Sequence, residues 1–165
     1  MESGGTLSAD EPQLLAVEPS YRNLLRVRYA IFWGILTVAA FVAFLVLREN
    51  APAYQVLPLA VPAIGLFVVI VAPERVYSRL RYRLTGRLLQ VVRGWMFHSD
   101  TVVPLVRVQH LDVVRGPLDK MFGTASLVVH TAGNLNSTVT VPGLNPERAA
   151  EMRDAIREHV RTDFE

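Results

Sequence analysis

Two long apolar runs occupy much of the first half of the chain. They cover residues 29–47 and 56–72, and neither contains Asp, Glu, Lys or Arg. Helices over these runs would be roughly 28 Å and 25 Å long at 1.5 Å per residue, close to the approximately 30 Å hydrocarbon core of a bilayer. Because no charged residue opposes insertion, the pattern predicts two transmembrane helices joined by an external loop over residues 48–55.

A soluble core and a cleaved signal sequence both fit these runs less well than membrane helices do. Buried helices of a soluble protein would need a polar shell that the remaining chain is too short to supply. A cleaved signal sequence is suggested by the small residues at 51–53, but its apolar core is usually about 7 to 15 residues long, shorter than the run at 29–47. Even after cleavage, the run at 56–72 would anchor the rest of the protein.

Basic residues near the runs predict the orientation, because cytoplasmic flanks carry the excess of Lys and Arg. Arginines flank the outer ends of both runs at positions 22, 26, 28, 75, 79, 81, 83 and 87. The loop at 48–55 contains only Arg48, next to Glu49. We therefore expect a multi-pass protein of the cytoplasmic membrane with both termini cytoplasmic, a cytoplasmic N-terminal segment over 1–28 and a cytoplasmic domain over 73–165.

Alternation of apolar and polar residues replaces the continuous apolar pattern after residue 73. Along residues 79–85, one face carries Leu80, Tyr82 and Leu84 and the other carries Arg79, Arg81 and Arg83. Further strand-like runs cover residues 86–97, 101–105, 106–115, 125–131 and 138–144. Pro104 restricts the run at 101–105 to a sheet edge or a strand end. The spacing predicts six or seven short antiparallel strands.

The chain ends in an amphipathic helix. Asn145 is suited to cap its N-terminus and Pro146 to occupy its first position. Apolar residues then recur at helical spacing at Ala149, Met152, Ile156 and Val160. We expect this stripe to dock on the strands, so that the helix plugs a small, partly open barrel. The fold class is thus a membrane helical hairpin followed by an all-β or α+β barrel with a C-terminal helix.

A turn at Gly116 and Pro117 leads into a short helix or loop between two of the strands. This segment presents Leu118, Met121 and Phe122, with Lys120 beside them. In one interpretation the three apolar side chains tuck inward and close the barrel. In the other they contact a partner or dip into the membrane surface.

Several motifs together resemble a known family. The stretches "VQHLDVV" and "FGTASLVVHTAG", and the "GL" before the last helix, are similar to the bacterial pleckstrin-homology-like (PH) domain of membrane proteins. The pair of apolar runs resembles the two-helix members of that family, and the likeness covers about residues 21–163. The resemblance implies a PH-like fold and a non-enzymatic membrane-associated module, with no catalytic residues to carry over.

Candidate chemistry in the sequence is sparse. The chain has no cysteine, which excludes disulfides, thiolate metal sites and thiol nucleophiles. His110, Asp112 and His130 fall on strands that could be neighbours, but no ligand-spacing motif accompanies them, so no metal or other cofactor is predicted. Nucleic-acid binding is not expected either, because alternation places Tyr82 opposite the basic face.

Two functional hypotheses follow. In the first, the protein is a non-enzymatic scaffold or regulatory subunit that binds a protein partner, for example another PH-like membrane protein. In the second, the cytoplasmic domain recognises anionic lipid through Arg79, Arg81, Arg83 and Lys120. A third idea, a role in transport, has no support from ionisable residues within the apolar runs.

Overall fold

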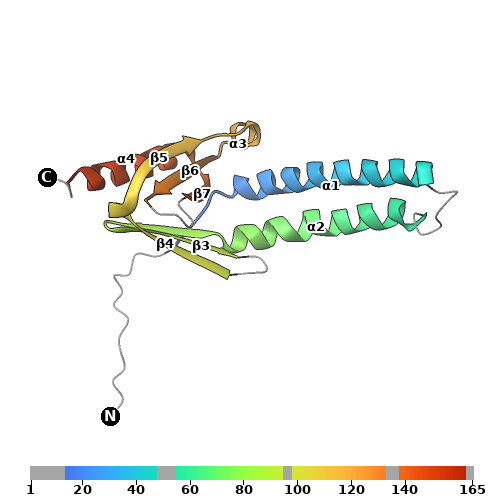
Figure 1. The fold of residues 1–165 in the computed structure, drawn as a ribbon, viewed down its shortest axis with the longest axis horizontal. Helices are drawn as coiled ribbons and strands as arrows, with labels where there is room; N and C mark the ends of the chain where they lie inside the picture. Colours follow the sequence, from blue (N-terminus) through green and yellow to red (C-terminus); the bar gives the residue numbers. More distant parts are fainter. Residues whose placement is uncertain (1–13, 48–54, 95–97, 133–137, 163–165) are drawn as a thin grey trace, which may run out of the picture.

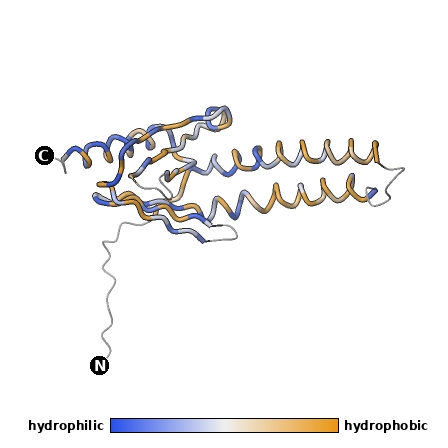
Figure 2. Tube along the Cα trace, viewed as in Figure 1, coloured by the Kyte–Doolittle hydropathy of each residue, from blue (hydrophilic) through white to orange (hydrophobic). Residues whose placement is uncertain are grey.

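The computed structural model describes residues 14–47, 55–94, 98–132 and 138–162, which form a long helical hairpin and a β-rich body. The hairpin consists of α1 (Ser20–Leu47) and α2 (Leu57–Arg79), which lie side by side and project from one end of the body (Figure 1). The remaining strands and helices form the β-domain. Hydrophobic residues dominate the projecting halves of both helices (Figure 2).

The hairpin confirms the prediction of two apolar helices. Both are long and apolar enough to cross a membrane, and few residues of their apolar stretches are buried within the structure. This exposure distinguishes them from the core helices of a soluble protein. The two helices pack closely at Gly65, where an added Cβ atom would lie 3.0 Å from Cε3 of Trp33. Each helix is longer than the apolar run that predicted it, because α1 starts at Ser20 and α2 continues through Arg79. The loop expected over 48–55 lies, except for its last residue, outside the described residues.

The β-domain contains two antiparallel sheets. The first has the strand order β1 (Leu15–Ala16), β2 (Arg81–Thr85), β3 (Leu88–Gly94) and β4 (His98–Pro104). The second has the order β5 (Val108–Val114), β6 (Ala125–Thr131) and β7 (Thr138–Leu144). A 3₁₀ turn, η2 (Leu105–Arg107), connects them, and α3 (Pro117–Phe122) links β5 to β6. The sheets do not close into a barrel, but the PH-like arrangement predicted from the sequence is present.

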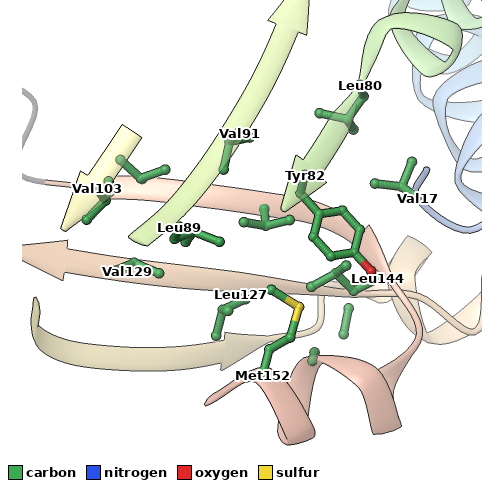
Figure 3. Packing of buried hydrophobic residues seen from close by; sticks show 14 of the residues in the cluster. Val17, Leu80, Tyr82, Leu89, Val91, Val103, Leu127, Val129, Leu144 and Met152 are labelled. Carbon is green, nitrogen blue, oxygen red and sulfur yellow. The ribbon is translucent and has the colours of Figure 1, made fainter. Parts of the chain in front are cut away.

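The hydrophobic core lies between the sheets and the last helix, α4 (Pro146–Thr162). Figure 3 shows Leu89 and Val91 of the first sheet facing Leu127 and Val129 of the second. Alternate residues of these strands are buried, which is the pattern of a strand with one face on the core. The apolar stripe of α4 is confirmed, since its first three members are buried and Val160 packs against the same cluster.

Two local expectations for the strands differ from the structure. The strand expected over 79–85 starts at Arg81, because α2 continues through Arg79 and the chain turns at Leu80. Arg79 therefore belongs to the helix and does not share the outer face of β2 with Arg81 and Arg83. In contrast, the prediction that Pro104 ends an edge strand is confirmed, as is the cap of α4, in which the Glu147 N–H donates to Asn145 Oδ1 at 3.0 Å.

Residues before the first apolar run complete the core of the β-domain. Val17, Tyr21, Leu24 and Leu25 are all buried in the same cluster as the strands. The short strand β1 pairs with β2 through Leu15 and Ala16. The N-terminal segment expected over 1–28 is therefore packed, from residue 15 onward, against residues more than 60 positions away. The helical hairpin and the β-domain are joined through the first turns of α1 as well as through α2.

Tyr82 links the first sheet to α4 through its hydroxyl group. The side chain is buried, and the Arg148 guanidinium group of the helix interacts with its hydroxyl group. This interaction, together with the hydrogen bond to Glu151, raises the pKa of Arg148. We expect Tyr82→Phe to lower the free energy of unfolding by about 1 kcal/mol, the usual net contribution of one polar side-chain interaction. Denaturant unfolding of the full-length protein in detergent measures this change. Adding Arg148→Gln to Tyr82→Phe should lower the free energy of unfolding little further. A full additional loss would contradict the pairing of the two side chains.

Candidate functional site

The three arginines of the predicted basic stripe do not converge on one point. Arg79 is the last residue of α2, and Arg81 donates to the neighbouring Leu80 carbonyl oxygen at 3.0 Å. Arg83 Nη2 donates to Gln90 Oε1 at 2.7 Å, and Gln90 Nε2 in turn donates to the Asp100 carboxylate at 2.8 and 2.9 Å. On the outer face of the first sheet, Arg83 thus belongs to a network of side-chain hydrogen bonds that ends at the Asp100 carboxylate.

The apolar residues of the short helix α3, which the sequence grouped together, differ in their exposure. Leu118 and Phe122 are partly buried and pack against the core, as the inward interpretation expects. Met121 is 75% exposed, and Lys120 beside it is exposed as well. Asp119 Oδ2 accepts from the Gly116 N–H at 3.0 Å and Oδ1 accepts from the Thr124 hydroxyl at 2.8 Å. These two bonds hold the segment in one geometry and leave Met121 and Lys120 as its outward side chains.

His110, Asp112 and His130 are brought together on the outer face of the second sheet. Asp112 Oδ1 lies 3.0 Å from His110 Nε2, and Oδ2 lies 3.5 Å from His130 Nε2. The Thr138 hydroxyl lies 3.2 Å from His130 Nδ1. The two imidazoles therefore flank a single carboxylate. Within the four described ranges of the chain, no group of three or more His, Asp or Glu side chains is placed to hold a metal ion.

Two arginines that the sequence did not single out influence Tyr21 where α1 enters the β-domain. Arg28, two turns after Tyr21 on α1, interacts electrostatically with the Tyr21 hydroxyl group. Arg93 interacts electrostatically with the same hydroxyl group from β3. Partial burial lowers the pKa of the Arg93 guanidinium. A signal for this arrangement was present, because Arg93 falls on the same side of β3 as the buried residues Leu89 and Val91.

An open hollow of about 310 Å³ lies along α1. Arg28, Tyr29 and Phe32 line it. Tyr29 packs against the core of the β-domain, whereas Phe32 belongs to the exposed apolar surface of the hairpin. The hollow therefore connects a cationic group to the apolar part of the helix.

The free edge of the first sheet provides a third surface. Within the described chain β4 pairs only with β3, so its other side is unpaired. Val102 and Val106 are more than half exposed beside it. A hollow of about 370 Å³ lined by Arg87, Pro104, Leu105 and Val106 lies at the end of the strand. This edge combines unpaired backbone groups with exposed apolar side chains.

Comparisons with known proteins agree with this architecture. The family model described as "Bacterial PH domain" matches residues 28–160. A curated relative, the "UPF0699 transmembrane protein YdbS" of Bacillus subtilis (strain 168), is 32% identical over 92 residues, which are 56% of each chain. The chain thus spans little more than half the length of that relative. No solved structure matches.

The matched region begins inside α1 and ends inside α4, so it includes most of the helical hairpin and nearly all of the β-domain. Residues 14–27, which contribute Val17, Tyr21, Leu24 and Leu25 to the core, lie before it. With its two apolar helices, the relative's transmembrane designation and the PH-like sheets, this chain is a membrane protein that belongs to the bacterial PH domain family.

Proposed function

We propose that this protein is a non-enzymatic scaffold or regulatory subunit of the cytoplasmic membrane that binds a protein partner through the unpaired edge of β4. Its termini and β-domain would lie in the cytoplasm, as the flanking arginines predict. The observation that carries the proposal is the edge itself. Proteins usually cover or interrupt an accessible strand edge with exposed apolar residues, because such an edge readily pairs with another chain.

The backbone alternation identifies which residues of β4 face outward. The Leu105 N–H donates to the Arg87 carbonyl oxygen at 3.0 Å. Val103 and Thr101 lie two and four residues before Leu105, so their backbone groups also face β3. In an antiparallel ladder, residues of the other parity direct their N–H and C=O groups away from the partner strand. Val102 and Asp100 therefore present backbone groups to a new strand, whereas Pro104 has no N–H to offer.

These features favour an extended protein segment as the partner. Main-chain hydrogen bonds to β4 would supply affinity, and the exposed Val102 and Val106 side chains would select apolar residues on the incoming strand. Another PH-like membrane protein, or a second copy of this chain, is suited to this pairing because anchoring in the same membrane raises the effective concentration of the two edges.

We expect Val102→Pro to abolish partner binding while the protein stays folded. Proline at this position removes an outward-facing N–H and leaves the ladder with β3 intact. A photo-crosslinking amino acid at position 106, in the full-length protein in its native membrane, reports binding as cross-linked adducts identified by mass spectrometry. The expected result is loss of the specific adduct in the proline variant.

Val102→Thr is the matched control, since threonine keeps both the backbone donor and the β-branched shape. It should retain the adduct at close to the level of the unmodified protein. Equal adduct yields in the proline and threonine variants, or no reproducible adduct with any protein including this chain itself, would count against the β4 edge as the binding surface.

Lipid recognition through Arg79, Arg81, Arg83 and Lys120 stays a prediction that the geometry does not favour. A headgroup site needs several donors aimed at one point. Here Arg79 and Arg81 lie on different elements, and Arg83 donates to Gln90. The proposed protein-binding role therefore rests on β4 and not on this stripe.

A further inference from the structure

The short helix α3 lies at the end of the β-domain from which the hairpin projects (Figure 1). The strand register gives the same position. β2 follows α2 after one residue and runs away from the hairpin, so the paired residues Leu88 and Pro104 mark the far end of the first sheet. The chain leaves that far end through η2, and β5 runs back toward the hairpin to reach α3. α3 also contacts α1 directly.

The part of α1 beside α3 precedes the apolar run. Ala125, which starts β6 just after α3, pairs with the end of β7, and Gly143 at that end lies against the ring of Tyr21 in the first turn of α1. α1 then continues through Arg28 to the apolar run at 29–47. About two turns of α1 therefore separate this level from the hydrocarbon core, and α3 projects toward it (Figure 1). The helix thus lies at the level of the lipid headgroups.

The outward side chains of α3 and of the strand end before it are apolar or basic. Met121 is 75% exposed and Val114 is 50% exposed. Arg115 and Lys120 are exposed as well, and neither makes an ion pair with a described residue. Asp119, the one acidic residue between Val114 and Thr124, accepts hydrogen bonds within this segment through both carboxylate oxygens. Val114, Arg115, Lys120 and Met121, here named the α3 surface, therefore suit the interface of an anionic bilayer.

The fold holds α3 in one conformation without help from lipid. Gly123 ends the helix with φ +66°, and the Thr124 N–H donates to the Asp119 carbonyl oxygen at 2.8 Å. On the inner side, Leu118 and Phe122 pack against the core. Because the backbone is already ordered, little conformational entropy is lost when the outward side chains enter the membrane interface.

We propose that the α3 surface lies in the headgroup layer of the bilayer that holds the hairpin, with the Met121 side chain reaching the first acyl carbons and Lys120 and Arg115 beside the phosphates. The bilayer is the occupant because the hairpin fixes this end of the β-domain at its surface. The contact adds a third attachment to those made by the two helices. Unlike the recognition of one particular headgroup, it needs no donors aimed at one point. It is separate from the β4 edge and does not depend on the proposed partner binding.

The chain has no cysteine, so a fluorophore can be attached at single chosen positions. The full-length protein with Met121→Cys carries nitrobenzoxadiazole at that residue and is reconstituted into vesicles of equal parts phosphatidylcholine and phosphatidylglycerol. Lipids with a nitroxide at a shallow or a deep acyl position then quench the probe according to its depth. We expect the shallow nitroxide to quench at least about twofold more than the deep one, because interfacial segments enter the bilayer by only about 5 to 10 Å.

Two exposed valines provide matched positions for the same probe. Val38→Cys, at a residue 64% exposed in the middle of the first apolar run, should be quenched most by the deep nitroxide. Val106→Cys, at a residue 59% exposed at the far end of the β-domain, should be quenched by aqueous iodide and by neither lipid. A probe at 121 that behaves like the one at 106 would overturn the proposal. Shielding of position 121 from iodide and from both lipids would also overturn it, because protein and not lipid would then cover α3.

A probe at Val114→Cys leaves Met121 available for substitution. Met121→Asp should reduce quenching of this probe by the shallow nitroxide, whereas Met121→Leu, which stays apolar, should preserve it. Met121 is exposed, so neither change should disturb folding. Lys120→Gln should shift the contact equilibrium about fivefold in these vesicles and leave it unchanged in phosphatidylcholine alone. Equal quenching in the Asp and Leu variants, or an equal effect of Lys120→Gln in both kinds of vesicle, would contradict a contact between the α3 surface and an anionic bilayer.

Discussion

Replacing Gly143 with alanine is expected to destabilise the β-domain by about 2 to 5 kcal/mol, because two penalties coincide at this residue. Its backbone has φ +71°, where a residue with a Cβ atom is strained by about 1 to 2 kcal/mol. The added Cβ would lie 2.5 Å from Cγ of Tyr21. Tyr21 is buried among the core residues, so relief of this overlap requires displacement of packed groups, at about 1 to 3 kcal/mol.

Gly123→Ala is the matched control for this substitution. Gly123 ends α3 with φ +66°, but an added Cβ would meet nothing within 4 Å. This variant should therefore lose only the backbone term of about 1 to 2 kcal/mol. Denaturant unfolding of each full-length protein in detergent, followed by near-ultraviolet circular dichroism, gives the comparison. Equal losses at the two glycines would show that Tyr21 does not pack on Gly143 in solution.

The close approach also anchors the start of α1 to the β-domain. The Glu18 N–H donates to the Gly143 carbonyl oxygen at 2.8 Å, next to the contact with the Tyr21 ring. The "GL" that precedes the last helix thus has a physical role in this chain. Gly143 lets the N-terminal segment lie against β7, and Leu144 is buried in the core.

Leu25→Ala is expected to cost about 2 to 5 kcal/mol of β-domain stability, the range for deleting three carbons from a packed core. Leu25 is 0% exposed, although it belongs to α1, and it packs in the same cluster as Leu127 and Ile156. The same unfolding assay in detergent measures the effect. The physical reason is that the core of the β-domain is incomplete without the first turns of the hairpin helix.

Val38→Ala on the same helix provides the comparison. Val38 is 64% exposed on the apolar surface of the hairpin, so its truncation should leave unfolding of the β-domain within about 0.5 kcal/mol of the unmodified protein. Similar losses for both variants would contradict a role of Leu25 specific to the domain core.

A fragment starting at Glu74 lacks Val17, Tyr21, Leu24 and Leu25, so we expect it to unfold without a cooperative transition. Functional experiments therefore use the full chain.

The sequence by itself determined the features that depend on residues close together along the chain. The apolar runs predicted both hairpin helices, because a helix facing lipid must be apolar on nearly every side. Alternation predicted the inward face of β2, and Asn145 with Pro146 predicted the start of α4. The motifs "VQHLDVV" and "FGTASLVVHTAG" indicated the family, which the match over 28–160 confirms.

Only the tertiary structure decided which distant groups meet. A two-residue strand such as β1 has no detectable period, and nothing local indicates that Leu25 packs in a core formed mainly by residues beyond position 80. Arg79 lies in α2 and not on the outer face of β2, because α2 continues beyond its apolar run. The periodicity of apolar residues indicates which face of a single helix or strand is buried. It does not indicate which helices and strands pack together, and a site formed by several of them depends on that packing.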